Sequence, residues 1–289
     1  MSSFELHAVG IGAQKAGSTW VSDMARQHPD VAVWHPKELE FFNDRKSYYQ
    51  ATRKKAYQSD LAGLAKYFND PENELYHLEV TPNYFWDRAA AERIAALFPN
   101  IKIVANLRQP VERAFSQWVM ARYNHRRETR SFEEVMQHET EYTERSRYAQ
   151  QLDLWLAHFP RKQIHLIALD EILSDPASTA YRLFEFLGLR PDVFLNASGK
   201  SNQAKSTRIP ALQNGINALV RQLSAVGLTS VVERARGSKL RNWVLQKNQH
   251  TSEFPKFDSA YNAQYWDRFA ADVDRLENEW GLQLNAWKP

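Results

Sequence analysis

A glycine-containing segment near the amino terminus holds the residues best suited to binding an anion. The mostly apolar segment 4–11 reads as a buried strand and runs into Gly12-Ala13-Gln14-Lys15-Ala16-Gly17-Ser18-Thr19-Trp20. Small residues let the backbone wrap closely, and the free N–H groups and dipole of a helix beginning at Ser18 favour negative charge. With Lys15 and two hydroxyls, the segment predicts an anion cradle. The alternative is a tight strand-to-helix turn with a solvent-exposed lysine.

The place of the lysine separates this loop from a nucleotide-triphosphatase loop, in which glycine, lysine and serine or threonine are consecutive. Lys15 stands two residues before Gly17 and therefore leaves the middle of the loop. A magnesium-dependent kinase also needs an acidic residue at the tip of a core strand. Asp170 follows the strand expected at 164–169, but it fits a strand end turning into the next helix better. A P-loop small-molecule kinase using ATP-Mg remains an alternative that depends on Asp170.

A second anion-binding position follows the clearest buried strand, 101–107. Arg108 stands at the carboxyl end of this strand, before a helix that begins at Pro110. That edge is where ligands bind in open α/β sheets, and a guanidinium can grip a phosphate through two parallel hydrogen bonds. Ser116, one to two turns into the helix, could face the same group. Two such sites indicate a ligand with two separate phosphate-bearing ends; the alternative is an arginine that caps loop carbonyls.

Strands and helices alternate along the first two thirds of the chain. We expect strands at 4–11, 75–80, 101–107 and 164–169, and helices at 18–27, 86–98, 111–122, 147–159 and 176–187. This alternation predicts an α/β fold, a P-loop-like parallel sheet flanked by helices on both faces. Residues 196–210 read as an exposed loop. The last third shows helices, near 210–223 and 259–280, and no convincing strand, so we expect a C-terminal helical cap.

Composition bounds the class of protein. The 289 residues contain 37 Lys and Arg against 34 Asp and Glu, and the resulting charge of +3 is too small to imply nucleic-acid binding. The chain has no cysteine, which excludes disulfides, thiolate metal sites and cysteine nucleophiles. It shows neither a signal peptide nor an apolar run long enough to span a bilayer. We expect a cytoplasmic, single-domain chain (1–289, core about 4–190, helical or lid region about 191–289), a monomer or weak homodimer.

Four stretches carry a resemblance to a known family. They are Gly12–Trp20, Lys37–Asn43, Glu79–Phe85 and Leu107–Ser116. In combination they resemble the sulfotransferases that use 3′-phosphoadenosine 5′-phosphosulfate (PAPS), in the branch of the heparan-sulfate and other carbohydrate sulfotransferases. The resemblance covers most of residues 5–190. Val80, Asn43 and Gln109 depart from the lysine, aspartate and aspartate that this branch often has there.

The resemblance implies an activity and roles for the matched residues. The chain would move a sulfuryl group from PAPS to a hydroxyl of a carbohydrate or small-molecule acceptor, without a metal, leaving adenosine 3′,5′-bisphosphate. The residues implied for the cofactor are Gln14, Lys15, Ala16, Gly17, Ser18, Thr19 and Trp20 around the 5′-phosphosulfate, Arg108 and Ser116 at the 3′-phosphate, and Lys205 or Arg208 in a closing loop. A non-catalytic binding protein with the same fold is a further alternative.

Two residues would carry the chemistry. Lys15 would stabilise the negative charge that grows on the leaving oxygen. Glu38 matches the catalytic base of the carbohydrate branch, and the neighbouring Phe41 and Phe42 would desolvate it. His35 is the rival base. The competing interpretation places Glu38 on a solvated loop, paired with Lys37 or Arg45, and an extended segment would point Glu40 the opposite way.

The acceptor side is expected to combine aromatic faces with a few polar groups. Candidates are His35, Glu79, Tyr84, Phe85 and Trp118, with Trp34 and Trp86 as further aromatic residues. Aromatic faces stack on sugars and flat rings, but such residues also build cores. Glu79 would orient the acceptor or Lys15.

Overall fold

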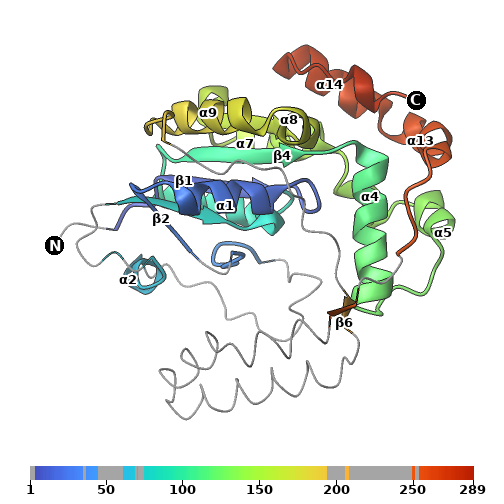
Figure 1. The fold of residues 1–289 in the computed structure, drawn as a ribbon, viewed down its shortest axis with the longest axis horizontal. Helices are drawn as coiled ribbons and strands as arrows, with labels where there is room; N and C mark the ends of the chain where they lie inside the picture. Colours follow the sequence, from blue (N-terminus) through green and yellow to red (C-terminus); the bar gives the residue numbers. More distant parts are fainter. Residues whose placement is uncertain are drawn as a thin grey trace, which may run out of the picture. The chain divides into compact units, whose positions relative to one another are not determined.

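A computed structural model describes residues 4–34, 37–44, 61–68, 70, 75–193, 206–207, 249–250 and 254–289 (Figure 1). The chain forms two compact units. One comprises Met1–Gln117, Arg130–Ser201 and Phe257–Pro289, and the other comprises Trp118–Thr129 and Asn202–Lys256. The predicted site residues His35, Lys205 and Arg208, and the helix expected near 210–223, lie outside the described residues. Within the described part, no helix has the length and apolar character needed to cross a membrane.

The first unit is built on a five-stranded sheet whose pairs are all parallel, as predicted. The strands are β1 (Ala8–Gly12), β2 (Val31–Val33), β3 (Tyr76–Val80), β4 (Lys102–Leu107) and β5 (Ile164–Ala168), and their order is β2-β3-β1-β4-β5. The central strand β1 has β3 on one side and β4 on the other. The chain from β1 leads to β2, and the chain from β3 crosses to β4, so the strand order reverses direction at β1. The carboxyl edge of such a position is the usual ligand site of an open α/β sheet.

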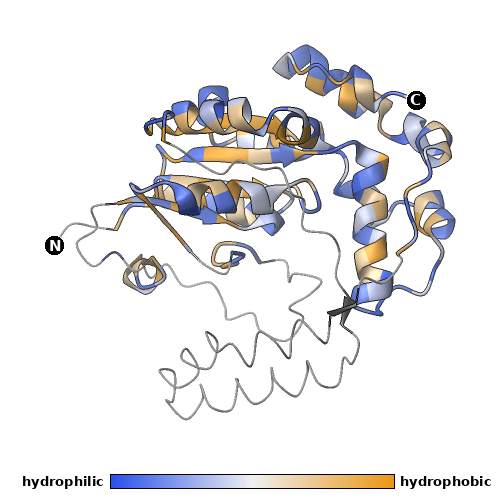
Figure 2. Cartoon of the chain, in the orientation of Figure 1, coloured by the Kyte–Doolittle hydropathy of each residue, from blue (hydrophilic) through white to orange (hydrophobic). Residues whose placement is uncertain are grey.

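Helices cover both faces because the strands are apolar on both sides. One hydrophobic cluster joins alternate strand residues such as Val9 and Ile103 to α3 (Arg88–Leu97), α7 (Tyr148–Leu156) and α14 (Ala270–Trp280). The other joins residues of opposite parity, such as Val104, to α1 (Ser18–Gln27), α8 (Leu169–Ser174) and α9 (Pro176–Leu187). In Figure 2 the strands are coloured mainly as hydrophobic, which fits a buried parallel sheet.

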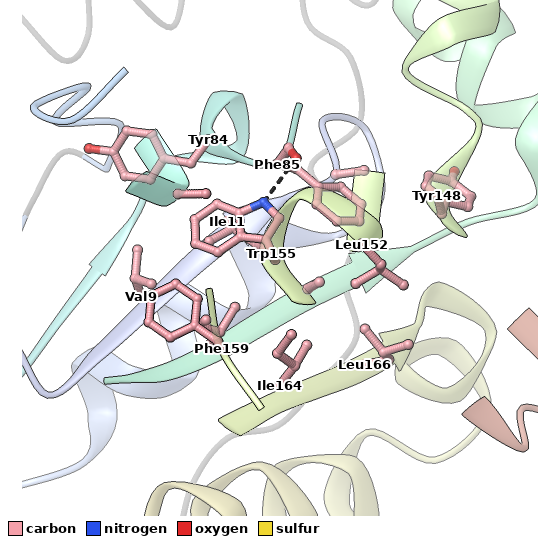
Figure 3. Close-up of a cluster of buried hydrophobic side chains, with 14 of the residues drawn as sticks. Val9, Ile11, Tyr84, Phe85, Tyr148, Leu152, Trp155, Phe159, Ile164 and Leu166 are labelled. Carbon is pink, nitrogen blue, oxygen red and sulfur yellow. Dashed lines mark hydrogen bonds between the residues drawn. The ribbon is translucent and has the colours of Figure 1, made fainter. Parts of the chain in front are cut away.

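Trp155 anchors the first cluster and reaches toward the site-bearing edge (Figure 3). Its indole N–H donates to the carbonyl oxygen of Phe85 over 3.0 Å. The ring also stacks on Phe159, with the ring centroids 5.9 Å apart. Burial of this ring therefore fixes the chain that follows β3 as well as filling the core.

The remaining elements of the first unit include η1 (Pro82–Tyr84), which follows β3, and the ten-residue helix α4 (Pro110–Val119), which follows β4. The others are α2 (Leu61–Ala65), α5 (Phe132–Gln137), α6 (Glu141–Glu144), η3 (Arg161–Gln163), α13 (Ala260–Tyr265), η4 (Trp266–Arg268) and η5 (Asn285–Trp287). The second unit contains the π-helical turn η2 (Met120–Asn124) and an antiparallel pair, β6 (Ser206–Thr207) with β7 (Gln249–His250).

Most predicted elements are confirmed within a few residues, and two expectations are wrong. The helix expected at 259–280 is interrupted, since α13 and α14 are separated by η4. No proline or glycine marks this interruption, so residue periodicity could not reveal it. The last third was expected to contain no strand, but it contributes β6 and β7. The three-residue strand β2 was not predicted, because so short a segment has no periodicity of its own.

Gly12, at the end of β1, lies so close to η1 that there is no room for a side chain at this position. Its φ is +133°, and a Cβ at this position would lie 2.5 Å from the Pro82 carbonyl oxygen. The contact brings the end of β1 against η1, which follows β3. Gly281, by contrast, has φ +68° with nothing within 4 Å of a built Cβ.

We expect Gly12→Ala to lower the free energy of unfolding by at least about 3 kcal/mol, because a backbone clash adds to an unfavourable φ. Gly281→Ala is the control for the φ cost alone and should lose about 1 kcal/mol. Chemical denaturation of the two variants measures both values. Equal losses would show that the approach of β1 to η1 is not tight.

Candidate active site

The loop between β1 and α1 has the backbone of an anion cradle. The glycine loop, Gly12–Gly17, ends with Gly17 at φ +98° as the N-cap of α1, and Lys15 in its middle also has a positive φ, +67°. The Ala13 N–H donates to the Asn106 carbonyl over 2.7 Å and ties the loop to β4. No side chain caps the N-terminus of α1, as far as the structure describes the chain. The first N–H groups of the helix therefore remain suited to an anion.

Three cationic groups gather around this loop. Burial lowers the pKa of Lys15 to about 8, and the nearby charges of Arg108 and Lys37 lower it further, while Glu38 opposes the shift. A guanidinium nitrogen of Arg108 lies 3.5 Å from the Lys15 carbonyl oxygen. Like charges brought together in a partly desolvated place repel one another. Such an arrangement is favourable when an anion is bound between them.

The segment Glu38–Phe42 carries the predicted base, and all five of its backbone N–H groups are hydrogen-bonded. The first donates to the Val80 carbonyl over 2.8 Å. The next two donate to a carboxylate oxygen of Glu79 and to the Thr81 hydroxyl, each over 3.2 Å. The last two donate to the Tyr84 hydroxyl, over 2.9 and 3.4 Å. Because these acceptors follow one another along β3 and η1, the 38–42 segment is held by residues 79–84.

Lys37 connects the glycine loop with the predicted base. Its ammonium donates to the Ser18 hydroxyl over 3.1 Å and to a Glu38 carboxylate oxygen over 3.0 Å. The pairing of Glu38 with Lys37 had been considered only as part of a solvated loop, but here the backbone is fixed and Lys37 is largely covered. The extended conformation considered for this segment is wrong, since Glu38 and Glu40 have φ of +72° and +52°.

A second chain of side-chain contacts joins the same two loops. The guanidinium of Arg145 donates to the Gln14 carbonyl oxygen over 2.5 Å, and the Gln14 amide donates to Asn83 over 2.5 Å. Asn83 in turn donates to the Glu40 carboxylate over 2.6 Å. Gln14 was predicted to bind the cofactor, and the structure instead uses its side chain to link the glycine loop with the 38–42 segment. Its backbone remains part of the loop.

The predicted cofactor residues occupy different places around the loop. Arg108 is partly exposed and pairs with Glu112 over 2.9 Å, one turn along α4. Ser116 is half-buried further along the same helix, and Thr19 is half-buried in the first turn of α1. Ala16 is fully buried under the loop, and Trp20 points into the hydrophobic core between α1 and the sheet. The indole of Trp20 is therefore a packing group.

The predicted acceptor residues are mostly core residues. Tyr84 and Phe85 are fully buried, and Figure 3 shows their rings in the cluster around Trp155. Glu79 is also fully buried, and one of its oxygens faces the 38–42 segment. Thus none of these three side chains is available to touch an acceptor in this structure. Trp86 is half-buried under the Arg145 guanidinium, 3.8 Å from the ring centroid.

Two aromatic candidates remain to be placed. Trp34 is half-buried and contacts Tyr67 edge to face, with centroids 4.8 Å apart. Trp118 belongs to the second unit, where its ring lies near Tyr123 and the Arg122 guanidinium.

Sequence reasoning missed the residues that fasten the two loops to each other. Thr81 and Asn83 were not singled out, although they lie in the segment 79–85 that carried the resemblance. The signal was a run of polar side chains directly after a buried strand. Such side chains must find hydrogen-bond partners when they are buried, and a neighbouring loop backbone supplies them.

Asp170, the residue on which the kinase alternative depends, has a structural partner. It stands in the first turn of α8, and its carboxylate accepts from the Trp287 indole N–H over 2.5 Å. Among the residues that the structure describes, no three His, Asp or Glu side chains are placed to hold a metal ion.

Comparison with known proteins gives consistent matches. The model of the sulfotransferase family matches residues 8–192, more than half of the chain. Heparan sulfate glucosamine 3-O-sulfotransferase 3B1 of Mus musculus is 31% identical over 200 residues, which cover 63% of this chain and 46% of that protein. Bifunctional heparan sulfate N-deacetylase/N-sulfotransferase 1 of Caenorhabditis briggsae is 28% identical over 203 residues, covering 62% and 22%. The chain thus spans less than half the length of either relative.

A solved structure matches over almost the whole chain. The sulfotransferase from Alicyclobacillus acidocaldarius aligns with a TM-score of 0.67 and 22% identity, covering 98% of both chains. At this identity the likeness concerns the fold. It agrees with the parallel sheet and flanking helices described above.

We expect Tyr84→Phe to loosen one end of the 38–42 segment. The ring stays in the core, but the Phe41 and Phe42 N–H groups lose their acceptor, which costs about 1–3 kcal/mol. Amide hydrogen exchange should accelerate most at these two residues. Leu39 and Glu40, which donate to other side chains, serve as internal controls. If amide exchange accelerated equally at all four residues, or at none of them, the Tyr84 hydroxyl would not be the specific acceptor of the Phe41 and Phe42 N–H groups.

Proposed function

This chain belongs to the sulfotransferase family, and on that premise we propose that it transfers a sulfuryl group from PAPS to a hydroxyl of a carbohydrate or small-molecule acceptor. The observation that carries the proposal is the gathering of Lys15, Lys37 and Arg108 around the glycine loop. This gathering supports a ligand with several negative charges. The adjacent carboxylate of Glu38 supports proton removal from an acceptor at the same place.

The donor set fits the cofactor. The glycine loop and the first turn of α1 offer backbone N–H groups and the hydroxyls of Ser18 and Thr19, which suit a 5′-phosphosulfate. Arg108, with Ser116 further along the chain, suits the 3′-phosphate, and a bound phosphate would compete with Glu112 for the guanidinium. The amide nitrogen of Asn106 adds a buried donor that has no hydrogen-bond partner among the described residues. It lies 4.0 Å from a Cβ built on Gly17.

Lys15 is the group we assign to the leaving oxygen. PAPS supplies an activated sulfuryl group, and its transfer leaves negative charge on the 5′-phosphate of adenosine 3′,5′-bisphosphate. Burial and the neighbouring charges of Arg108 and Lys37 lower the pKa of Lys15, so its ammonium form is disfavoured. An anion in the loop would raise that pKa again and keep the ammonium charged during the reaction.

Glu38 is the group we assign to the acceptor proton. Its backbone is fixed by the Val80 carbonyl, and its carboxylate is oriented by Lys37. In transfer, the acceptor oxygen forms a bond to sulfur, the bond from sulfur to the phosphate oxygen breaks, and the acceptor proton passes to Glu38. Lys37 touches Ser18 as well, so an anion at the start of α1 would draw this ammonium away from the Glu38 carboxylate.

The acceptor is proposed at the level of its class. Both relatives compared above bear names that refer to heparan sulfate, and this supports a sugar hydroxyl or amine among the acceptors to be tried first. Roles for His35 as rival base, for Lys205 or Arg208 in a closing loop and for Trp118 at the acceptor stay predictions, as do a cytoplasmic location and a monomer or weak homodimer.

We expect adenosine 3′,5′-bisphosphate to protect the protein from thermal unfolding at pH 7, whereas ATP with magnesium does not. Because the pKa of Lys15 is about 8, affinity for the bisphosphate should fall as pH rises from 7 to 9. In Lys15→Arg, whose guanidinium stays charged, this fall should be much smaller. Thermal shifts and calorimetric titration at several pH values measure both effects. No shift at a high concentration of the bisphosphate would refute the cofactor assignment.

We expect Lys15→Ala and Glu38→Gln each to lower turnover at least about a hundredfold while the fold is retained. The assay is sulfate transfer to a panel of glycans, phenols and alcohols, detected by mass spectrometry, with circular dichroism to check folding. Asp170→Ala is the control, and it should cost stability through the lost Trp287 contact but leave turnover similar. Magnesium-dependent ATP turnover that Asp170→Ala abolishes, with no sulfate transfer by the wild type, would favour the kinase alternative. Near-normal sulfate transfer by Glu38→Gln would move the base to His35.

A further inference from the structure

One buried acid near the site has no part in the reaction proposed above. Glu79, at the end of β3, is 0% exposed. One of its carboxyl oxygens accepts from the Leu39 N–H over 3.2 Å and from the Thr81 hydroxyl. The other has no hydrogen-bond partner among the described residues. An ionised carboxylate is unfavourable in the protein interior when one of its oxygens accepts no hydrogen bond. The uncharged carboxylic acid is favoured there.

The groups around Glu79 would repel a negative charge. The charged groups are Glu38 and Glu40 of the 38–42 segment, whereas the Tyr84 hydroxyl of η1 is uncharged. On β1, the residues paired with this part of β3 are Val9 and Gly10, which carry no charge. Burial raises the pKa of Glu79 to about 8, with Glu38 and Glu40 adding to the rise and the hydrogen bonds from Thr81 and Leu39 opposing it.

We propose that Glu79 is a positioning residue that holds the Glu38-bearing segment in place as an uncharged carboxylic acid. The inference rests on the proposed function for its catalytic consequence, but the protonated state of Glu79 does not depend on the transfer reaction. As an acid, Glu79 accepts the Leu39 N–H without placing a charge beside Glu38 and Glu40. It thereby fixes the residue next to the base.

Loss of the proton from Glu79 would disturb this arrangement. A third negative charge would appear beside two other carboxylates. Residues 38–41, which are partly exposed, could relieve the repulsion by moving. Glu38 would then lie away from the acceptor. Turnover should therefore fall on the alkaline side even when the cofactor is saturating and keeps Lys15 charged.

The free energy of unfolding should also depend on the protonation of Glu79. An ordinary glutamate in the unfolded chain ionises near pH 4.5, whereas Glu79 in the folded protein ionises near pH 8. Between these values the folded state binds more protons than the unfolded state, so the contribution of Glu79 to stability is complete below pH 4.5. It falls as pH rises to 8 and is constant above that.

Glu79→Gln tests the inference, because the amide keeps an acceptor oxygen and cannot ionise. We expect the melting temperature of Glu79→Gln minus that of the wild type, measured without ligand, to increase by several degrees from pH 5 to pH 8 and then to level off. Glu92→Gln, on the exposed side of α3, is the matched control and should give a difference independent of pH. A flat difference for Glu79→Gln would overturn the inference, whether or not the protein transfers sulfate.

Turnover supplies the second measurement. At pH 7, Glu79→Gln should retain at least tenfold more turnover than Glu79→Leu, which removes the acceptor of the Leu39 N–H. The alkaline limb of kcat at saturating PAPS should move to higher pH in Glu79→Gln, although Lys15 is unchanged. Two results would contradict a positioning role for the protonated acid: equal turnover in the two variants, or an alkaline decrease of kcat that occurs at the same pH in Glu79→Gln as in the wild type. Absence of transfer in the wild type would instead refute the proposed function, and the melting measurement would still decide the state of Glu79.

Discussion

The site depends on how five consecutive backbone N–H groups find acceptors. The 38–42 segment adopts positive φ at Glu38 and Glu40, so it cannot pair as a strand. Its N–H groups are instead satisfied by residues 79–84, through one carbonyl and three side chains. Orphaned N–H groups would be costly in this partly buried place. The position of Glu38 is therefore set by the end of β3, a strand some forty residues away in the sequence.

Electrostatic interactions connect the glycine loop with the 38–42 segment. Lys15 loses proton affinity and Glu79 gains it, and in both cases burial is the main cause. Lys37 spans the gap by touching both Ser18 and Glu38. The site thus places Lys37 beside Glu38 and brings the like charges of Lys15, Lys37 and Arg108 together around the glycine loop. Binding of a polyanion would relieve their repulsion, which is a physical reason for a preformed site.

Much of the fold followed from local patterns. The helix 18–27 was predicted with the observed bounds, because His28-Pro29 ends it. The helix predicted from about 176 to 187 is also confirmed, and a proline begins it. The strand β4 was clear because Ile103, Val104 and Ala105 are consecutive apolar residues at its centre and Pro110 follows it. Short or interrupted elements escaped, since β2 has three residues and the break at η4 carries no proline or glycine. These depend on packing partners that no local window contains.

The sequence by itself determined which groups are offered for chemistry: a small-residue loop with Lys15 at its centre, an arginine at the end of the strand 101–107, and a glutamate close to two phenylalanines. Residue types and local spacing are enough for that, because they fix which groups a strand end or a helix start can offer. Only the tertiary structure decided which polar residues serve as supports. Glu79, Tyr84 and Gln14 were expected at a ligand, yet their partners are backbone and side-chain groups from distant parts of the chain. Burial and hydrogen-bond satisfaction are properties of the packed molecule, and a linear pattern does not contain them.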